Sequence, residues 1–359
     1  MQTVFGEAGA AIYSEMNQDP LDPDAFALVL SGSSATIYPM AGGAIEVDWG
    51  DRNANERCGN VFTAGGAISC EYDLPGTYRV SIIGDMTAYG DEAGLETNSG
   101  ISRVLQWGNT GLTDLSFAFY GASKLMDVPD NLPPGLTSMN STFFYAYALN
   151  DPDIARWDTS SVENFQSTFK YATNFNVDIG DWDVSSATYM HHIFYRATAF
   201  NQDINDWDIS NVTSLRGAFR GATAFSQDLN DWDTSKVNSF MSMFSEKEYN
   251  GNISSWDTSS ATTMAYMLRN KETFNQDISG WDVSNVQDFT GMLGQNSVFS
   301  QDLSGWDTSS AIYMEEMFDG SASFSSDLSS WCVPLVASRP TLFSDGSGIS
   351  AEPVWGTCP

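Results

Sequence analysis

The stretch FNQDINDWDISNVTSLRGAFRGA, residues 200–222, recurs in close copies along most of the 359-residue chain. From Trp157 to Trp331 the tryptophans of successive copies follow one another at steps of 25 residues. A single step of 24 residues separates Trp232 from Trp256. Spacing this regular is typical of stacked supersecondary units that contact only their neighbours and share one core. The sequence therefore predicts a solenoid.

The second half of each copy predicts a short helix. In one copy the apolar residues are Val212, Leu215, Phe219 and Ala222, which is the spacing of one buried helical face. Ser210 precedes this stripe, and serine is a residue type that caps a helix N-terminus. The segment FNQDI is too short for a helix and predicts a short parallel strand. We therefore expect a right-handed α/β solenoid of about ten strand–helix turns, with a repeat length in the leucine-rich-repeat range.

These repeats resemble a known family. The copies FNQDISGWDVSNVQDFTGML and FNQDINDWDISNVTSLRGAF resemble the BspA-like leucine-rich repeats of bacterial surface proteins, which also occur in viruses and some protists. The resemblance covers roughly residues 100–359. It implies a leucine-rich-repeat solenoid that serves as an adhesive or recognition surface. It brings no catalytic residues with it.

Residues 24–86 predict a small all-β immunoglobulin-like sandwich. Short segments rich in β-branched and aromatic residues, such as FALVL and TYRVSII, alternate with Gly, Asn and Pro. The segments AIEVDWGD (44–51) and YDLPGTYRVSIIG (72–84) resemble the polycystic-kidney-disease (PKD) domain. Arg52 stands where that family has a second glycine. The resemblance implies a spacer or a cap for the repeats.

Composition sets the other boundaries. We predict an N-terminal arm at 1–23, an acidic, glycine-rich linker at 87–100, the solenoid at 101–331 and a C-terminal cap at 332–359.

The four cysteines allow three disulfide connectivities. The local pairs Cys58 with Cys70 and Cys332 with Cys358 are favoured, because each pair lies within one predicted structural unit. Closing the second loop would add about 3 kcal/mol of stability. The alternative is four reduced, buried thiols.

The charge of the chain limits its partners. Acidic residues outnumber basic ones by 46 to 15, which gives a net charge of -31. This charge repels a nucleic-acid backbone and an anionic bilayer surface. The sequence also lacks an apolar run long enough for a transmembrane helix. We therefore expect no nucleic-acid partner and no membrane insertion.

Two aspartates in each copy form acidic columns along the predicted solenoid. We expect each carboxylate to accept backbone N–H bonds within a turn. The alternative is calcium that bridges neighbouring turns, and its candidate ligands are Asp203, Asp228, Asp277 and Asp302. The adjacent His191 and His192 would point about 100° apart on a helix, so they cannot chelate one metal together. No other cofactor is expected.

The sequence predicts a non-enzymatic recognition protein. It contains no nucleophile elbow and no glycine-rich phosphate loop. The repeated carboxylates lie in nearly equivalent environments, whereas a glycosidase needs two unlike ones. Tyr189, Tyr266 and Tyr313 occupy positions that the core does not require, so we predict a ligand face there for a protein or glycan on a cell surface. A glycan-degrading enzyme on a solenoid scaffold is an alternative.

The ends of the chain suggest where it works. It starts at Met1 without a secretion signal and ends in the segment PVWGTCP, without a membrane anchor. These features predict a virion component, such as a phage head decoration, tail or fibre protein, which binds a host surface. In that case the N-terminal arm would dock to other virion proteins. The alternative is a secreted bacterial cell-surface adhesin.

Overall fold

The computed structural model describes residues 21–91, 98–246 and 248–359. Most of the predicted arm (1–23) and the central part of the predicted linker (87–100) lie outside these ranges. The chain divides into two compact units, Met1–Ser161 and Val162–Pro359. Each unit has its own buried apolar residues.

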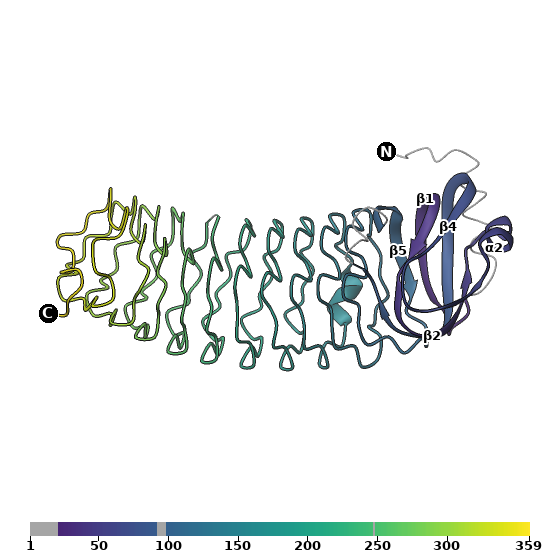
Figure 1. Ribbon diagram of the computed structural model, residues 1–359, viewed down its shortest axis with the longest axis horizontal. Coiled ribbons are helices and arrows are strands. Elements are labelled where there is room, and N and C mark those ends of the chain that lie inside the picture. Colours follow the sequence, from purple (N-terminus) through teal and green to yellow (C-terminus); the bar gives the residue numbers. More distant parts are fainter. Residues whose placement is uncertain (1–20, 92–97, 247) are drawn as a thin grey trace. The chain divides into compact units, whose positions relative to one another are not determined.

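A five-stranded antiparallel sheet begins the first unit (Figure 1). Its strands are β1 (Phe26–Ile37), β2 (Pro39–Asp48), β3 (Val61–Thr63), β4 (Ile68–Tyr89) and β5 (Ile101–Gln106), in the order β3-β2-β4-β1-β5. The unit also contains the helix α2 (Arg52–Cys58) and the short 3-10 helices η1 (Asn98–Gly100) and η2 (Pro152–Arg156). The sheet therefore extends beyond residues 24–86, because β4 continues to Tyr89 and β5 pairs with β1.

The predicted immunoglobulin-like sandwich is wrong, because a sandwich needs two packed sheets and these strands form one. Segments expected as separate short strands join into longer ones. β4 alone covers 22 residues and runs through Leu74, Pro75 and Gly76. The expected WGD turn leads into a helix, because Asp51 Oδ1 accepts the N–H of Ala54 at 2.9 Å and caps α2.

Aromatic side chains join this sheet to the coils that follow it in the first unit. The ring of Phe26 in β1 lies 4.7 Å from that of Tyr89 in β4 and 6.1 Å from that of Trp107. Tyr89 in turn lies 6.4 Å from Phe119. The first five residues of β1 are all buried, so this strand is covered on both faces. Coils therefore take the place that a second sheet would occupy in a sandwich.

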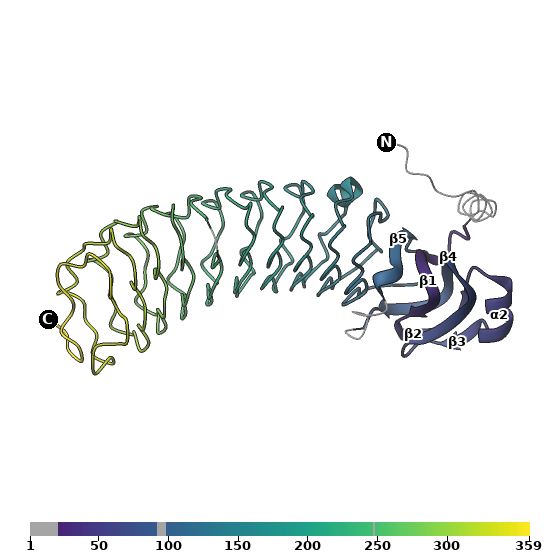
Figure 2. The same ribbon diagram turned by 90° about the horizontal axis from the view of Figure 1, so that it is seen from above.

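The second unit is a stack of coils whose described residues form turns, bends and isolated bridges. Figures 1 and 2 show these coils as successive loops, and the described residues after η2 contain neither a helix nor a strand. Neighbouring coils are connected by isolated parallel bridges, such as Ser214 with Ser239 and Asp288 with Tyr313. Over its described residues, this unit has no element that matches the predicted strand–helix turn. The prediction of an α/β leucine-rich-repeat solenoid is therefore wrong.

Backbone conformation explains why the expected helix does not form. Gly217 and Gly221 have φ values of 57° and 69°, in the left-handed region that an α-helix excludes. Their N–H groups donate to Met241 O at 2.9 Å and Ser245 O at 3.0 Å in the next coil, rather than to the carbonyl four residues back. Two tandem turns thus produce the apolar spacing that resembles a helix. Equivalent pairs with positive φ are Ser167 and Tyr171, His192 and Arg196, Ser242 and Glu246, and Tyr266 and Asn270.

The tryptophans form a ladder through the core. The rings of Trp182 and Trp207 are stacked, with centroids 6.5 Å apart and planes 3° from parallel. Trp207 Nε1 donates to Ile179 O at 3.1 Å, and Trp232 Nε1 donates to Ile204 O at 2.9 Å. Each of these buried indole N–H groups is thus satisfied by the preceding coil, as a buried donor requires.

The FNQD segment, predicted as a strand, forms a second ladder. Asn201 N donates to Asn176 Oδ1 at 2.9 Å, and Ser226 N donates to Asn201 Oδ1 at 2.9 Å. Gln227 Nε2 donates to Asn201 O at 3.0 Å. Side-chain amides therefore replace part of the backbone pairing that a parallel sheet would supply.

Candidate functional site

The tandem turns place two neighbouring columns of side chains on one side of the second unit. Backbone bonds from Tyr171 N to Tyr195 O and from Arg196 N to Arg220 O, each 2.8 Å long, set the columns in register. Charged and aromatic residues gather there and next to it. We call this group the turn face, and it consists of Lys170, Tyr171, Tyr195, Arg196, Arg220, Glu246, Tyr266 and Arg269.

Three cations surround one tyrosine ring on the turn face. Lys170 Nζ lies 5.1 Å from the ring centroid of Tyr195. The guanidinium carbons of Arg220 and Arg196 lie 5.6 Å and 5.9 Å from the same centroid. Such cation–π contacts are favourable, and they hold the charges close together. Burial lowers the pKa of Lys170.

Glu246 binds two of these cations. Arg196 Nη2 donates to Glu246 Oε2 at 2.7 Å, and Arg220 Nε donates to Glu246 Oε1 at 2.9 Å. Burial opposes ionisation of Glu246, but the hydrogen bonds and charges of the two arginines outweigh it and keep the pKa below its ordinary value. The carboxylate is therefore ionised at neutral pH. It neutralises only part of the local positive charge.

Burial and these nearby cations lower the pKa of both histidines. His192 has a φ of 61°, so it lies in a tandem turn rather than on the predicted helix. Burial, followed by the charges of Lys170, His191, Arg216 and Arg220, lowers the pKa of His192 to about 4. The pKa of His191 is also lowered, first by burial and then by nearby cations. Both rings are therefore neutral at pH 7, in a chain whose net charge is -31.

A hollow of about 390 Å³ opens beside Glu246 on the turn face. Its lining combines guanidinium, amide, hydroxyl and aromatic groups from Arg220, Ser245, Tyr266, Arg269, Asn270 and Gln295. Arg269 lies over the ring of Tyr266, with Cζ 5.4 Å from the centroid, and its Nη1 donates to Glu316 Oε2 at 2.6 Å. We call this cavity the turn-face hollow.

The three tyrosines predicted as a ligand face do not converge. Tyr189 and Tyr313 are each 54% exposed and lie at bridge positions several coils apart. Tyr266 is half-buried and lines the turn-face hollow. Sequence reasoning missed its neighbours Arg220 and Arg269. A signal was present, because eight of the 15 lysines and arginines fall between residues 170 and 271.

The four candidate calcium ligands all accept backbone N–H groups. Asp203 accepts the N–H of Asn205 at 3.1 Å, and the equivalent distances are 3.0 Å at Asp277 and at Asp302. Asp228 accepts a backbone N–H from the next coil at 2.6 Å. Within the described ranges, no group of three or more His, Cys, Asp or Glu side chains is arranged to hold a metal ion. Calcium bridging stays the untested alternative to turn capping.

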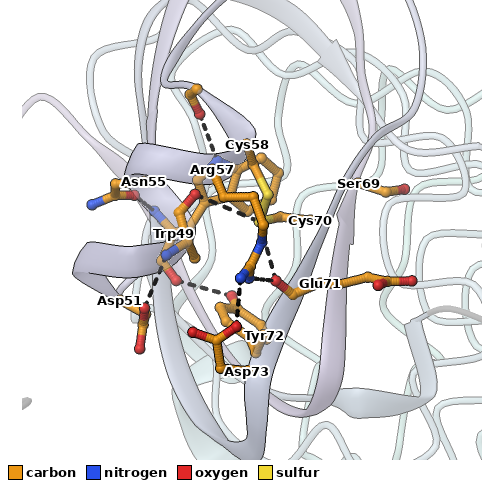
Figure 3. Close-up of a disulfide and its surroundings, with 12 residues drawn as sticks. Trp49, Asp51, Asn55, Arg57, Cys58, Ser69, Cys70, Glu71, Tyr72 and Asp73 are labelled. Carbon is orange, nitrogen blue, oxygen red and sulfur yellow. Dashed lines mark hydrogen bonds and ion pairs between the residues drawn. A yellow bond between two sulfur atoms is a disulfide. The ribbon is translucent and has the colours of Figure 1, made fainter.

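All four cysteines are in disulfides, Cys58 with Cys70 and Cys332 with Cys358. Figure 3 shows the first, which ties the end of α2 to β4, next to a hydrogen bond from Arg57 to Asp73 of 2.5 Å. Structural disulfides persist in oxidising surroundings, so these two disulfides indicate an extracellular protein. Among the described helices, none is long and apolar enough to cross a membrane.

Comparison with known proteins identifies a family. One family model matches residues 137–252 and 245–354, which together exceed half of the 359 residues. No curated protein and no solved structure matches the chain. The resemblances to BspA-like leucine-rich repeats and to a PKD domain are corrected, because the coils lack strand–helix units and the N-terminal strands form a single sheet. The chain belongs to the family described as Mycoplasma protein of unknown function, DUF285.

Proposed function

We propose that the protein is a non-enzymatic binding scaffold on the outside of a cell, and that its turn face contacts a protein or glycan on another surface. One observation carries this proposal, namely the contrast between columns of the second unit. The tryptophan and aspartate columns repeat from coil to coil and make ladder or turn bonds. In the two turn-face columns the residue type changes from one coil to the next. Lys170 is followed by Tyr195 in one column, and Tyr171 is followed by Arg196 in the other. Side chains that the coil itself does not require are suited to contact with a partner.

The carboxylates support binding without a catalytic step. A glycosidase needs one carboxylic acid whose pKa is raised, so that it stays protonated at working pH. Each described Asp or Glu whose pKa is shifted is shifted downward. At Asp233, for example, the hydroxyl and amide of Ser235 lower the pKa. Such groups act as acceptors rather than as proton donors.

The placement on a phage particle, predicted from the sequence, is withdrawn. Neither the fold nor the family match supports a phage component, and the description of the family refers to a cellular organism. The arm expected to dock to other virion proteins lies largely outside the described residues. Display on a cell surface is consistent with the two disulfides.

Two measurements test this function. Brief protease treatment of intact producing cells should release peptides of residues 162–359, whereas recovery only after lysis would contradict surface display. Purified protein should bind intact cells of another type, and an Arg220→Met, Arg269→Met double variant should bind less. Lys236→Met is the matched control, because Lys236 is exposed outside the turn face. Equal loss with the control would refute a role for the turn face.

A further inference from the structure

The turn-face hollow has the chemistry of a binding site for a charged sugar. We propose that it binds a glycan unit bearing a carboxylate or sulfate, so that the natural ligand is an acidic glycan. This inference rests on the proposed binding function and names its ligand class. Its basis is a local excess of positive charge together with a lining suited to sugar hydroxyls.

The charges on the turn face and around the hollow favour an anion. The guanidinium groups of Arg196, Arg220 and Arg269 bind two carboxylates, Glu246 and Glu316. A third carboxylate, Asp319, accepts a hydrogen bond from Nε2 of the lining residue Gln295 at 2.7 Å. Lys170 and Arg216 lie in earlier coils and add positive charge near His191 and His192. These five cations outnumber the three carboxylates, so this part of the surface attracts an anion that the rest of a chain of net charge -31 repels.

The arginines keep donors for a ligand after binding their glutamates. Arg220 uses Nε and Nη2 for Glu246, and Arg269 uses Nη1 for Glu316. Across the described parts of the chain, Arg220 Nη1 and Arg269 Nη2 make no further hydrogen bond. A planar guanidinium with unused N–H groups matches a carboxylate or sulfate. The glutamates orient these groups without using all of their donors.

The rest of the lining suits a sugar ring. Asn270 and Gln295 supply amide groups and Ser245 supplies a hydroxyl, which can exchange hydrogen bonds with ring hydroxyls. Tyr266 lines the wall and holds the Arg269 guanidinium over its ring at this site. The volume of about 390 Å³ lies within the range of small-ligand sites, about 300–1,000 Å³. The hollow therefore has room for one or two sugar units.

The columns extend the site along the coils. Tyr171, Tyr195 and Arg196 lie in the coils before Arg220, and backbone bonds hold them in register. Adjacent coils joined by parallel pairing lie about 5 Å apart. A linear acidic glycan that enters the hollow would thus meet further cations and tyrosines at regular intervals. This repetition adds affinity for longer oligosaccharides.

Binding of defined oligosaccharides to the full chain tests the inference. The probes are a sulfated heparin-derived oligosaccharide, a carboxylated oligogalacturonate and their desulfated or carboxyl-reduced counterparts. We expect at least one acidic probe to bind at least tenfold more tightly than its neutral counterpart. The acidic probe that binds shows whether the site recognises a sulfate or a carboxylate. Equal binding of neutral probes, or no binding by either acidic probe, would overturn the inference.

Three variants locate the site. Arg220→Met and Arg269→Met should each weaken acidic-probe binding about tenfold or more, because hydrogen bonds to charged groups are lost. Asn270→Gly should weaken it about two- to tenfold. Its φ of 61° suits glycine, so this variant keeps the fold even where an arginine variant unfolds. Lys236→Met should bind within about twofold of wild type. An equal loss of probe binding in all four variants would exclude the hollow as the binding site.

Two further experiments separate this inference from the proposed function. A single-stranded oligonucleotide of matched charge that binds as tightly as the acidic glycan would overturn the glycan assignment. Enzymatic removal of acidic glycans from target cells should abolish cell binding. Cell binding that survives this treatment would overturn the inference and leave the binding function intact. Absence of cell binding in every condition would contradict both.

Discussion

Arg196 reaches across Gly221 to Glu246, 50 residues further along the chain, and its Nη2 lies 2.7 Å from Oε2 of the carboxylate. The contact skips the coil between them. It is allowed because Gly221 has no side chain, and a Cβ there would come 2.8 Å from Arg196 Cγ. The absence of a side chain at Gly221 thus allows an ion pair between coils two repeats apart, and its carboxylate, Glu246, lines the turn-face hollow.

Substitution of this glycine should destabilise the second unit. Gly221→Ala adds a Cβ at a φ of 69° and displaces Arg196, so we expect the free energy of unfolding to fall by about 1–2 kcal/mol. Gly280→Ala is the control, because a Cβ there meets nothing within 4 Å. It should change stability by less than about 0.5 kcal/mol. Urea unfolding measures both, and similar losses would contradict the role given to Gly221.

A buried lysine should make stability depend on pH. Lys271 is fully buried and donates to Phe244 O. Burial lowers its pKa to about 7, against the opposing charges of Glu248 and Glu246. The unfolded chain, with a lysine pKa near 10.4, then binds more protons between about pH 7 and pH 10. Stability from this group therefore rises with pH across that window and is lost as pH falls through about 7.

Replacement of this lysine separates its contribution from that of other groups. Lys271→Met removes a buried charge while keeping similar volume. The lowered pKa makes the charged form costly at pH 6, and the lost hydrogen bond to Phe244 O offsets part of that cost, so we expect a net gain of about 1–4 kcal/mol. The slope of unfolding free energy between pH 7 and pH 10 should also flatten. Lys236→Met, at an exposed position, should leave both quantities unchanged. An unchanged or steeper slope in Lys271→Met would show that the lysine is not the group that titrates.

Removal of calcium should leave the melting temperature unchanged. The carboxylates of Asp203, Asp277 and Asp302 already accept N–H groups within their own turns. Thermal unfolding with and without a chelator measures this. A ligand present at 100 times its Kd would add about 2.7 kcal/mol. A clear drop in melting temperature that calcium reverses and magnesium does not would establish the metal site instead.

Loss of the C-terminal disulfide should weaken the end of the second unit. Cys332 and Cys358 close a loop of 26 residues, so the Cys332→Ser, Cys358→Ser double variant should lose about 3 kcal/mol. Urea unfolding under oxidising conditions measures the loss against the wild-type protein, and both proteins keep the Cys58–Cys70 disulfide under these conditions. Unchanged stability in the variant would mean that neighbouring coils, rather than the crosslink, hold this segment.

The repeat period was readable from the sequence, but the local backbone was not. Tryptophan spacing predicts stacked coils, because one buried indole recurs in every copy. The helix was wrongly predicted because Leu215 and Phe219, four residues apart, fit a helical face as well as two tandem turns. Glycines at positions 217 and 221 were the contrary signal, since glycine favours positive φ and weakens a helix.

Long-range pairing limited the prediction of the sheet and of the site. Strand-forming segments of the first unit were recognised, but local patterns could not show that β4 lies between β1 and β2 in one sheet. Tyr266 was predicted as a ligand residue, whereas Arg220, Glu246 and Arg269 were not. Their contacts span about one or two repeats, so they emerge only when the copies are aligned in their structural register.

The hydrogen bonds of the tryptophan ladder favour insertion or deletion of complete coils over that of partial ones. Trp207 donates to Ile179 and Trp232 donates to Ile204, so deletion of the 25 residues 183–207 would bring Trp232 to the carbonyl that Trp207 now uses. Every donor then keeps an acceptor. Deletion of half a copy would leave a buried N–H unsatisfied, at a cost of about 1–3 kcal/mol. Genes for such chains can therefore gain or lose complete coils by unequal recombination without a penalty at the junction.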